Sequence, residues 1–224
     1  MCFSASASFV AGTALLAMGV ATLRMTSQRA EIPLAAIPLL FGVQQITEGL
    51  IWLSFRPGSA LPNTALTFIY SLFSHVLWPM FVPFAVGRLE TVAWRKKAIA
   101  ACQLAGVAVG LYLLYFLVRF PVTSRVIGGH IVYDSPHFYI VPVLVVYLVS
   151  AAVSSLVSSR RIIQVFGAFL LATFVAAYAI HAANLVSIWC FFAAVASCLV
   201  FLHFKQERIS AMSGGAATVR RATP

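Results

Sequence analysis

The chain has 224 residues, of which 62% are hydrophobic and only 9% are charged, and its formal net charge is +10. A soluble domain carries about 25% charged residues, so this composition excludes an ordinary water-soluble protein. The basic residues are scattered over short segments between apolar runs, which argues against nucleic acid as a partner and favours the lipid bilayer.

Seven apolar stretches are long enough to cross a membrane, since about 20 helical residues span a hydrocarbon core about 30 Å thick. We expect helices, because the alternation of a membrane barrel is absent and backbone groups in lipid must pair internally. Residues 1–9 contain no Lys or Arg, so we expect the first stretch to be retained as a span rather than cleaved. The stretches are residues 4–23, 32–55, 63–87, 98–118, 138–158, 162–183 and 185–204.

The distribution of Lys and Arg predicts an amino terminus outside the cell and a carboxyl terminus in the cytoplasm, because cytoplasmic loops gather basic residues. The odd-numbered loops and the tail hold Arg24, Arg29, Arg88, Arg95, Lys96, Lys97, Arg160, Arg161, Lys205, Arg208, Arg220 and Arg221. The even-numbered loops hold only Arg56, Arg119 and Arg125. We therefore expect an all-α bundle of seven transmembrane helices over residues 1–204, followed by a basic cytoplasmic tail, 205–224, without regular structure.

Small residues and prolines predict how the helices pack. Gly106 and Gly110 form a G-x-x-x-G pattern, which lets two helix backbones approach closely. Pro79 and Pro83 lie inside the third stretch and predict a kink just after His75. The sequence has no internal repeat, so a carrier built from two related halves is not supported.

Glu48 is the most informative residue, because an ionisable side chain in a membrane span costs a few kcal/mol and marks a functional site. It lies in the second stretch, with Gln44 one turn earlier. His75 lies in the third stretch and His181 in the sixth, and the predicted topology places all three in the outer half of the bilayer. We expect the Glu48 carboxyl to face protein rather than lipid, in an outward-facing polar pocket shared with both histidines.

This Glu/His group allows more than one function. Glu48, His75 and His181 could bind a divalent metal such as zinc, and a metal with one open position would activate water for hydrolysis. Glu48 could instead be the general base, with the histidines as metal ligands. The alternatives are a hydrogen-bonded network that locks three helices together, a non-catalytic sensor or small-ligand-binding protein, and a proton-coupled carrier. The metal-dependent hydrolase ranks first by a small margin, and the ligand could be a lipid or another small molecule.

Further residues are candidates for the wall of the pocket or for positioning its side chains. On the spans these are Gln44, Ser71, Trp78 and Asn184, and in the fourth loop His130, Asp134 and His137. The loop group could bind metal, but we favour a turn in which Asp134 caps Ser135 and Pro136. The Gly128-Gly129 pair would let this loop act as a lid over the mouth of the bundle.

Cys2 is the second candidate catalytic residue. Removal of the initiator Met would leave a terminal amine beside its thiol, and this pair could act as a nucleophile or ligand. The alternatives are a free thiol and a disulfide with Cys190. Cys102 and Cys198 have the character of small packing residues.

Five segments carry a resemblance. They are Met-Cys-Phe-Ser-Ala at 1–5, Leu-Phe-Gly-Val-Gln-Gln-Ile-Thr-Glu-Gly at 40–49, Phe-Ser-His-Val-Leu-Trp-Pro at 73–79, Tyr-Asp-Ser-Pro-His-Phe at 133–138 and Trp-Cys-Phe-Phe-Ala-Ala at 189–194. The chain resembles, over nearly all of residues 1–204, a family of uncharacterised bacterial membrane proteins. The resemblance implies a multi-pass protein of a bacterial inner membrane and no particular reaction.

Two other seven-helix classes can be compared at specific residues, where the retinal class fails and the hydrolase class keeps only a fold-level analogy. Retinal proteins need a Lys in the seventh helix, and residues 185–204 contain none, so no retinal is expected. Membrane hydrolases of the alkaline ceramidase type are similar in helix count and in scattered His, Asp and Ser. Their paired histidines four residues apart are absent, because Leu185 stands four residues after His181.

Overall fold

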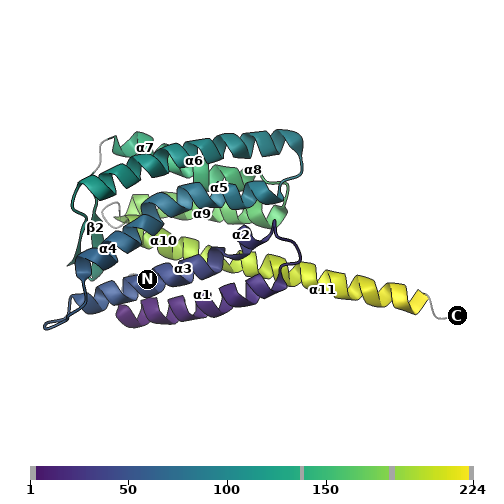
Figure 1. Ribbon diagram of the computed structural model, residues 1–224, viewed down its shortest axis with the longest axis horizontal. Coiled ribbons are helices and arrows are strands. Elements are labelled where there is room, and N and C mark those ends of the chain that lie inside the picture. The colour runs from purple at the N-terminus through teal and green to yellow at the C-terminus, as the bar shows by residue number, and fades with distance from the viewer. Residues whose placement is uncertain (1–3, 137–138, 182–184, 222–224) are drawn as a thin grey trace.

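The computed structural model describes residues 4–136, 139–181 and 185–221. Within these residues, seven helical spans are long and apolar enough to cross a membrane, which confirms the predicted number. They run alternately up and down one bundle axis (Figure 1). The spans are Ala5–Met25, Ile32–Ser54, Asn63–Leu89, Ala93–Arg119, Ile140–Val157, Arg161–Ala179 and Ile188–Ser210.

Four of the spans are interrupted and contain more than one helical segment. The helical segments are α1 (Ala5–Met25), α2 (Ile32–Ala35), α3 (Ile37–Ser54), α4 (Asn63–Ser71), η1 (Leu72–Leu77), α5 (Trp78–Leu89), α6 (Ala93–Arg119), α7 (Ile140–Leu148), η2 (Val149–Val153), α8 (Ser154–Val157), α9 (Arg161–His181), α10 (Leu185–Ala196) and α11 (Cys198–Arg221). The segments η1 and η2 are π-helices, which widen the turn by one residue and often occur at functional sites.

The third span bends between α4 and α5, where the sequence predicts a kink (Figure 1). In η1 the backbone N–H of Trp78 donates to the carbonyl of Phe73, five residues earlier. The next donor in this register would be Pro79, which has no N–H and leaves the carbonyl of Ser74 without a helical partner. The hydroxyl of Tyr147 on α7 donates to that carbonyl at 2.6 Å, so the bent span is held by a side chain from the fifth span.

The G-x-x-x-G pattern of α6 lies against the bent span. A Cβ atom added at Gly106 would collide with the carbonyl oxygen of Pro79, and one at Gly110 would come within 2.8 Å of the Met80 side chain. The predicted close helix contact is confirmed, since only glycine allows these two backbones to approach so closely.

The fourth loop forms a β-hairpin, which the all-α prediction missed. Strands β1 (Thr123–Ile127) and β2 (His130–Asp134) pair antiparallel, with Ile127 opposite His130. The turn residues Gly128 and Gly129 have φ values of 57° and 78°, as a two-residue hairpin turn that matches the strand twist requires. β-Branched residues on either side of the Gly-Gly pair favour the strands.

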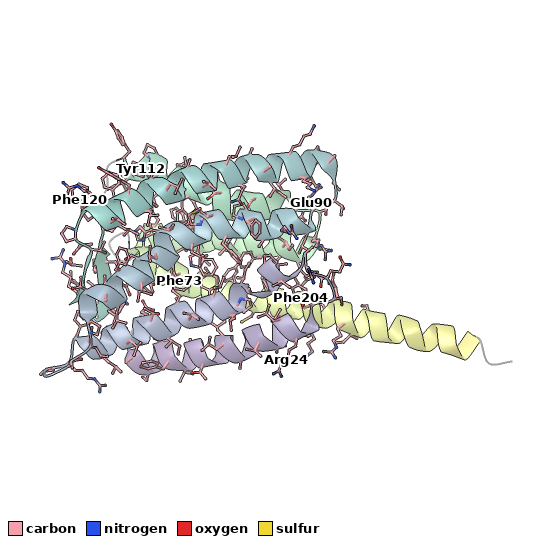
Figure 2. The ribbon with its side chains drawn as sticks, viewed as in Figure 1. Arg24, Phe73, Glu90, Tyr112, Phe120 and Phe204 are labelled. Atoms are coloured by element: carbon pink, nitrogen blue, oxygen red, sulfur yellow. The ribbon has the colours of Figure 1, made fainter. Side chains whose placement is uncertain are left out.

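The hairpin defines one end of the bundle, which we call the hairpin end, and the loops 26–31, 90–92 and 158–160 define the opposite, basic end (Figure 1). Figure 2 shows Arg24 and Glu90 toward the basic end and Phe120 toward the hairpin end. At the basic end, the Glu90 carboxylate accepts hydrogen bonds from the backbone N–H groups of Val92 at 2.9 Å and Ser159 at 2.7 Å. This one carboxylate therefore ties two loops together.

Helix α11 continues past the bundle to Arg221 (Figure 1). The sequence predicts no regular structure from residue 205, whereas the structure continues the seventh span as a helix. Its first exposed turns are anchored by an ion pair of 2.7 Å between Glu207 and Arg160, which lies in the loop 158–160. Helix-favouring residues such as Lys205, Gln206 and Glu207 explain why the helix does not stop at the bundle surface.

Candidate functional site

Glu48 lies on α3 with its side chain inside the bundle. It is 0% exposed, and the hydroxyl of Tyr133 on β2 donates to its Oε1 atom at 3.4 Å. The prediction that this carboxyl faces protein is confirmed. A carboxyl group pointing at acyl chains would cost a few kcal/mol, which burial against a hydroxyl donor reduces.

Gln44 lies one turn from Glu48 and is also 0% exposed. Its Oε1 atom accepts a hydrogen bond of 2.7 Å from the indole N–H of Trp78 on α5. The Trp78 ring in turn stacks on Phe41 with 3.8 Å between ring centroids. Gln44 and Trp78 were both candidates for the pocket. Their hydrogen bond joins the second span to the third.

His75 lies in η1 and is buried. Its Nδ1 atom lies 2.8 Å from the Ser74 hydroxyl, and its Nε2 atom lies 3.3 Å from the Ser135 hydroxyl just after β2. Because a hydroxyl can donate or accept, these contacts suit either neutral form of the ring. The imidazole is held between the third span and the hairpin.

The end of β2 connects Glu48 with His75. Tyr133 reaches Glu48, and Ser135, two positions later, reaches His75. Tyr133 also stacks on Tyr70 of α4, with 4.3 Å between ring centroids. Sequence analysis missed both hairpin residues as site residues. The available signal was the β-branched pair Ile131-Val132 beside Tyr133, which favours a strand.

Cys190 of α10 completes this cluster. It is a free, buried cysteine, and its thiol interacts with the side chains of Gln44 and Tyr70 and lies within the field of Glu48. The seventh span therefore joins the second and third spans here. Cys2, the disulfide partner considered from the sequence, lies outside the described residues.

A cavity of about 380 Å³ opens beside the cluster at the hairpin end. Ser74, His75, Tyr133 and Cys190 form its polar wall. Apolar side chains from the fourth, fifth, sixth and seventh spans form the remainder, and they are Leu113, Ile140, Val143, Leu144, Tyr147, Phe174, Tyr178, Leu185 and Trp189. Ile140 and Tyr178 at the rim are 58% and 52% exposed, so the cavity opens on the side of α7 and α9.

The remaining predicted residues divide into three groups. Ser71 is fully buried on α4. His130 and Asp134 lie on β2, where Asp134 forms an ion pair of 2.7 Å with Arg125. The third group lies outside what the structure describes, namely Cys2, His137, Asn184 and the side chain of His181.

No group of three or more His, Cys, Asp or Glu residues in the described part of the chain is arranged to hold a metal ion. The metal site predicted from the sequence therefore has no support from the residues described. The set of Glu48, His75 and His181 stays a prediction, because the side chain of His181 is not described.

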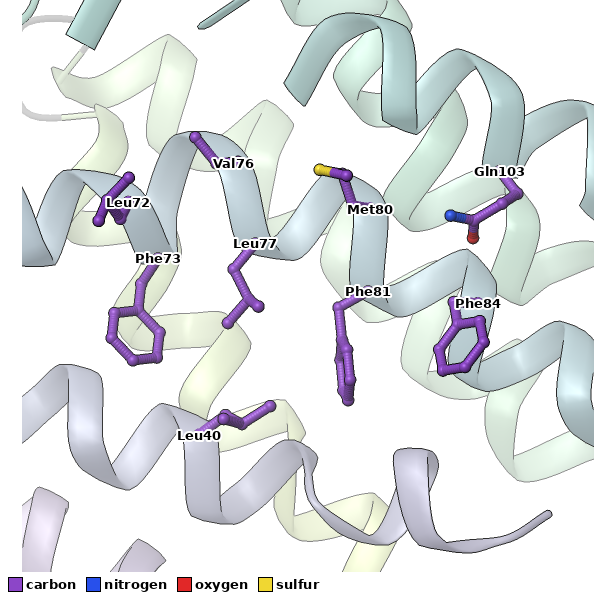
Figure 3. A pocket seen from close by; sticks show the side chains of 9 residues that line it. All are labelled: Leu40, Leu72, Phe73, Val76, Leu77, Met80, Phe81, Phe84 and Gln103. Atoms are coloured by element: carbon purple, nitrogen blue, oxygen red, sulfur yellow. The ribbon is translucent and has the colours of Figure 1, made fainter. Parts of the chain in front are cut away.

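A second, larger groove lies on the outer surface of the bundle (Figure 3). Its volume is about 500 Å³, and its walls come from the second, third and fourth spans, with Phe73, Leu77, Phe81 and Phe84 along one side. Gln103 of α6 is its only amide-bearing side chain. This groove has the composition of a surface against lipid chains, and the chemically varied residues gather instead around the 380 Å³ cavity.

The fold and the cavity define a helical bundle of the multi-pass membrane type, with a buried polar cluster beside a cavity at one end. The chain belongs to the DUF6629 family, a family of unknown function, whose model matches residues 1–215. The match covers all seven spans and the cavity. No curated protein and no solved structure matches the chain.

Proposed function

We propose that this protein resides in a membrane and binds a small amphiphilic molecule in the 380 Å³ cavity at the hairpin end. The observation that carries the proposal is the division of the cavity into one polar wall and one extensive apolar wall. Ligand sites in proteins are typically concavities of about 300–1,000 Å³, mostly apolar, with a few placed polar groups. This cavity has that size and that composition.

The polar wall is held in place before any ligand arrives. His75 is fixed by two hydroxyls, Tyr133 by its stacking on Tyr70, and Gln44 behind them by the Trp78 indole. Such preorganisation lowers the entropy lost on binding. The exposed rim residues belong to α7 and α9, so a ligand dissolved in the bilayer would reach the cavity sideways between these helices.

The same geometry favours binding over the metal-dependent hydrolysis ranked first from the sequence. A hydrolytic His is commonly oriented by a carboxylate on the nitrogen that does not face the nucleophile. In this protein both His75 nitrogens contact serine hydroxyls, Ser74 and Ser135. The residues that the structure describes also contain no group arranged to hold the metal that this hydrolysis would need.

The orientation belongs to the same proposal, with the amino terminus outside, the carboxyl terminus in the cytoplasm and the cavity in the outer half of the bilayer. Its support is that the loops rich in Lys and Arg all lie at the basic end, whereas Arg56, Arg119 and Arg125 lie at the hairpin end. The family resemblance of the sequence favours a bacterial inner membrane as the location.

Native mass spectrometry of the purified protein with 6-phenylhexan-1-ol tests the binding function. We expect one bound molecule per chain. Leu144→Trp, which fills the cavity, should weaken binding at least tenfold. Val145→Trp is the matched control, because Val145 is the next residue on α7 and is 54% exposed, and it should bind as the wild type does. Equal binding by both variants would contradict the proposal.

A further inference from the structure

We infer that the ligand carries a positively charged amine or ammonium group, which this cavity binds in preference to a neutral or anionic group. The inference rests on the proposed binding function and specifies the charge of the molecule bound. Two independent features of the cavity carry it, namely an aromatic wall and a buried carboxyl group behind the polar wall.

The aromatic wall contains Trp189 and two aromatic side chains in contact with it. Trp189 contacts Tyr147 at 5.4 Å and Phe174 at 5.2 Å between ring centroids, with interplanar angles of 62° and 80°. Tyr133 and Tyr178 line the same cavity, so its aromatic residues come from β2, α7, α9 and α10. The faces of aromatic rings carry negative charge density and attract ammonium groups, and aromatic cages of this kind recognise organic cations.

The carboxyl group is that of Glu48. It does not line the cavity itself, but the Tyr133 hydroxyl that contacts it does, and its field reaches Cys190 in the same wall. Glu48 is fully buried, and a cation bound beside Tyr133 would favour the ionised form of its carboxyl and be attracted by it. A positive group placed between Tyr133 and Cys190 would be stabilised.

Positive side chains do not compete for this position. Neither Lys nor Arg occurs among the lining residues that the structure describes or, in the sequence, at positions 137–138, 180–184 and 186–187. Arg125 at the hairpin end is 63% exposed and pairs with Asp134, and Arg119 lies over the ring of Phe120. A carboxylate ligand would find neither Lys nor Arg among the lining residues that the structure describes.

The amine could belong to a free amphiphile or to the headgroup of a lipid. A cavity of about 380 Å³ admits an ethanolamine headgroup or a single-ring amine, with any longer chain leaving between α7 and α9. The chemistry recognised is the same in both cases, and competition between the two ligand types separates them.

Three ligands that differ only in their terminal group test the charge preference of the full-length wild-type protein. The probes are 6-phenylhexylamine, 6-phenylhexan-1-ol and 6-phenylhexanoate at pH 7, with binding measured by native mass spectrometry. We expect the amine to bind at least tenfold more tightly than the alcohol, and the alcohol more tightly than the carboxylate. Displacement of the amine by lysophosphatidylethanolamine, but not by lysophosphatidylglycerol, would assign the lipid source, and no displacement would assign a free amine.

The outcomes separate this inference from the binding function. Equal affinity for amine and alcohol would overturn the charge preference and leave the binding function standing, whereas binding of none of the three would overturn both. Glu48→Gln should reduce the amine preference to less than threefold. If that variant does not fold, the wild-type series still decides, because it compares ligands rather than proteins.

Discussion

The hydroxyl of Tyr147 donates a hydrogen bond of 2.6 Å to the backbone carbonyl of Ser74. It replaces the donor that Pro79 lacks and so supports the π-helical segment that carries His75. Tyr147 also lines the 380 Å³ cavity. One side chain of the fifth span therefore stabilises the bend of the third span and shapes the space beside it.

Replacing Tyr147 with Phe should destabilise the protein by about 1–3 kcal/mol, because a buried carbonyl loses its hydrogen-bond donor while the ring keeps its packing. The measurement is the thermal midpoint of unfolding in detergent. Tyr115→Phe on α6 is the control, since Tyr115 is 61% exposed and should tolerate the loss of its hydroxyl. Equal midpoints for the two variants would show that the Ser74 carbonyl finds another donor.

Glu90 makes stability at the basic end depend on pH. Burial of the carboxyl acts to raise its pKa, but hydrogen bonds from the N–H groups of Val92, Ser159 and Thr91 outweigh it and lower the folded-state pKa below the ordinary value of 4.5. Its contribution to stability is therefore complete above pH 4.5 and is lost as the pH falls through the lower, folded-state pKa.

The stability difference between wild type and Glu90→Gln should thus be largest near pH 7 and shrink below pH 4.5. Thermal midpoints of both proteins between pH 3 and pH 7 measure it. Glu207→Gln serves for comparison, because the Glu207 side chain is 45% exposed and an exposed ion pair contributes about 0–1 kcal/mol. A difference that stays constant over this range would contradict the role given to Glu90.

Reporter fusions test the proposed orientation. A fluorescent protein joined after Arg221 should fold and fluoresce in the cytoplasm, and alkaline phosphatase inserted at Gly129, in the exposed hairpin turn, should be active outside. Alkaline phosphatase inserted in the loop 26–31 should be inactive. This control shows that the enzyme works only when it is placed outside. The reverse pattern would place the cavity in the cytoplasmic half of the bilayer.

The spans and the burial of Glu48 could be predicted because both follow from the cost of polar groups in hydrocarbon. A run of about 20 apolar residues leaves few alternatives, and a lone carboxyl within it must turn toward protein. The hydrogen bond between Gln44 and Trp78 was not predicted, although both residues were candidates for the pocket.

The hairpin and the role of Cys190 could not be predicted in the same way. The strands β1 and β2 are five residues each and lie outside the spans, so they carry little pattern of their own. The contact of Cys190 with Gln44 and Tyr70 depends on how α10 is rotated against α3 and α4. No spacing along the chain determines that rotation, since four spans lie between α3 and α10 and three lie between α4 and α10.

The gathering of Lys and Arg at the basic end also constrains how copies of this protein can associate. Membrane proteins whose basic residues are divided evenly between the two ends can insert in both directions and form antiparallel pairs. On the proposed orientation, a chain with twelve basic residues toward one end and three toward the other would insert in a single direction. Every copy in a membrane then presents its cavity on the same side, and any symmetric homo-oligomer must have its rotation axis along the membrane normal.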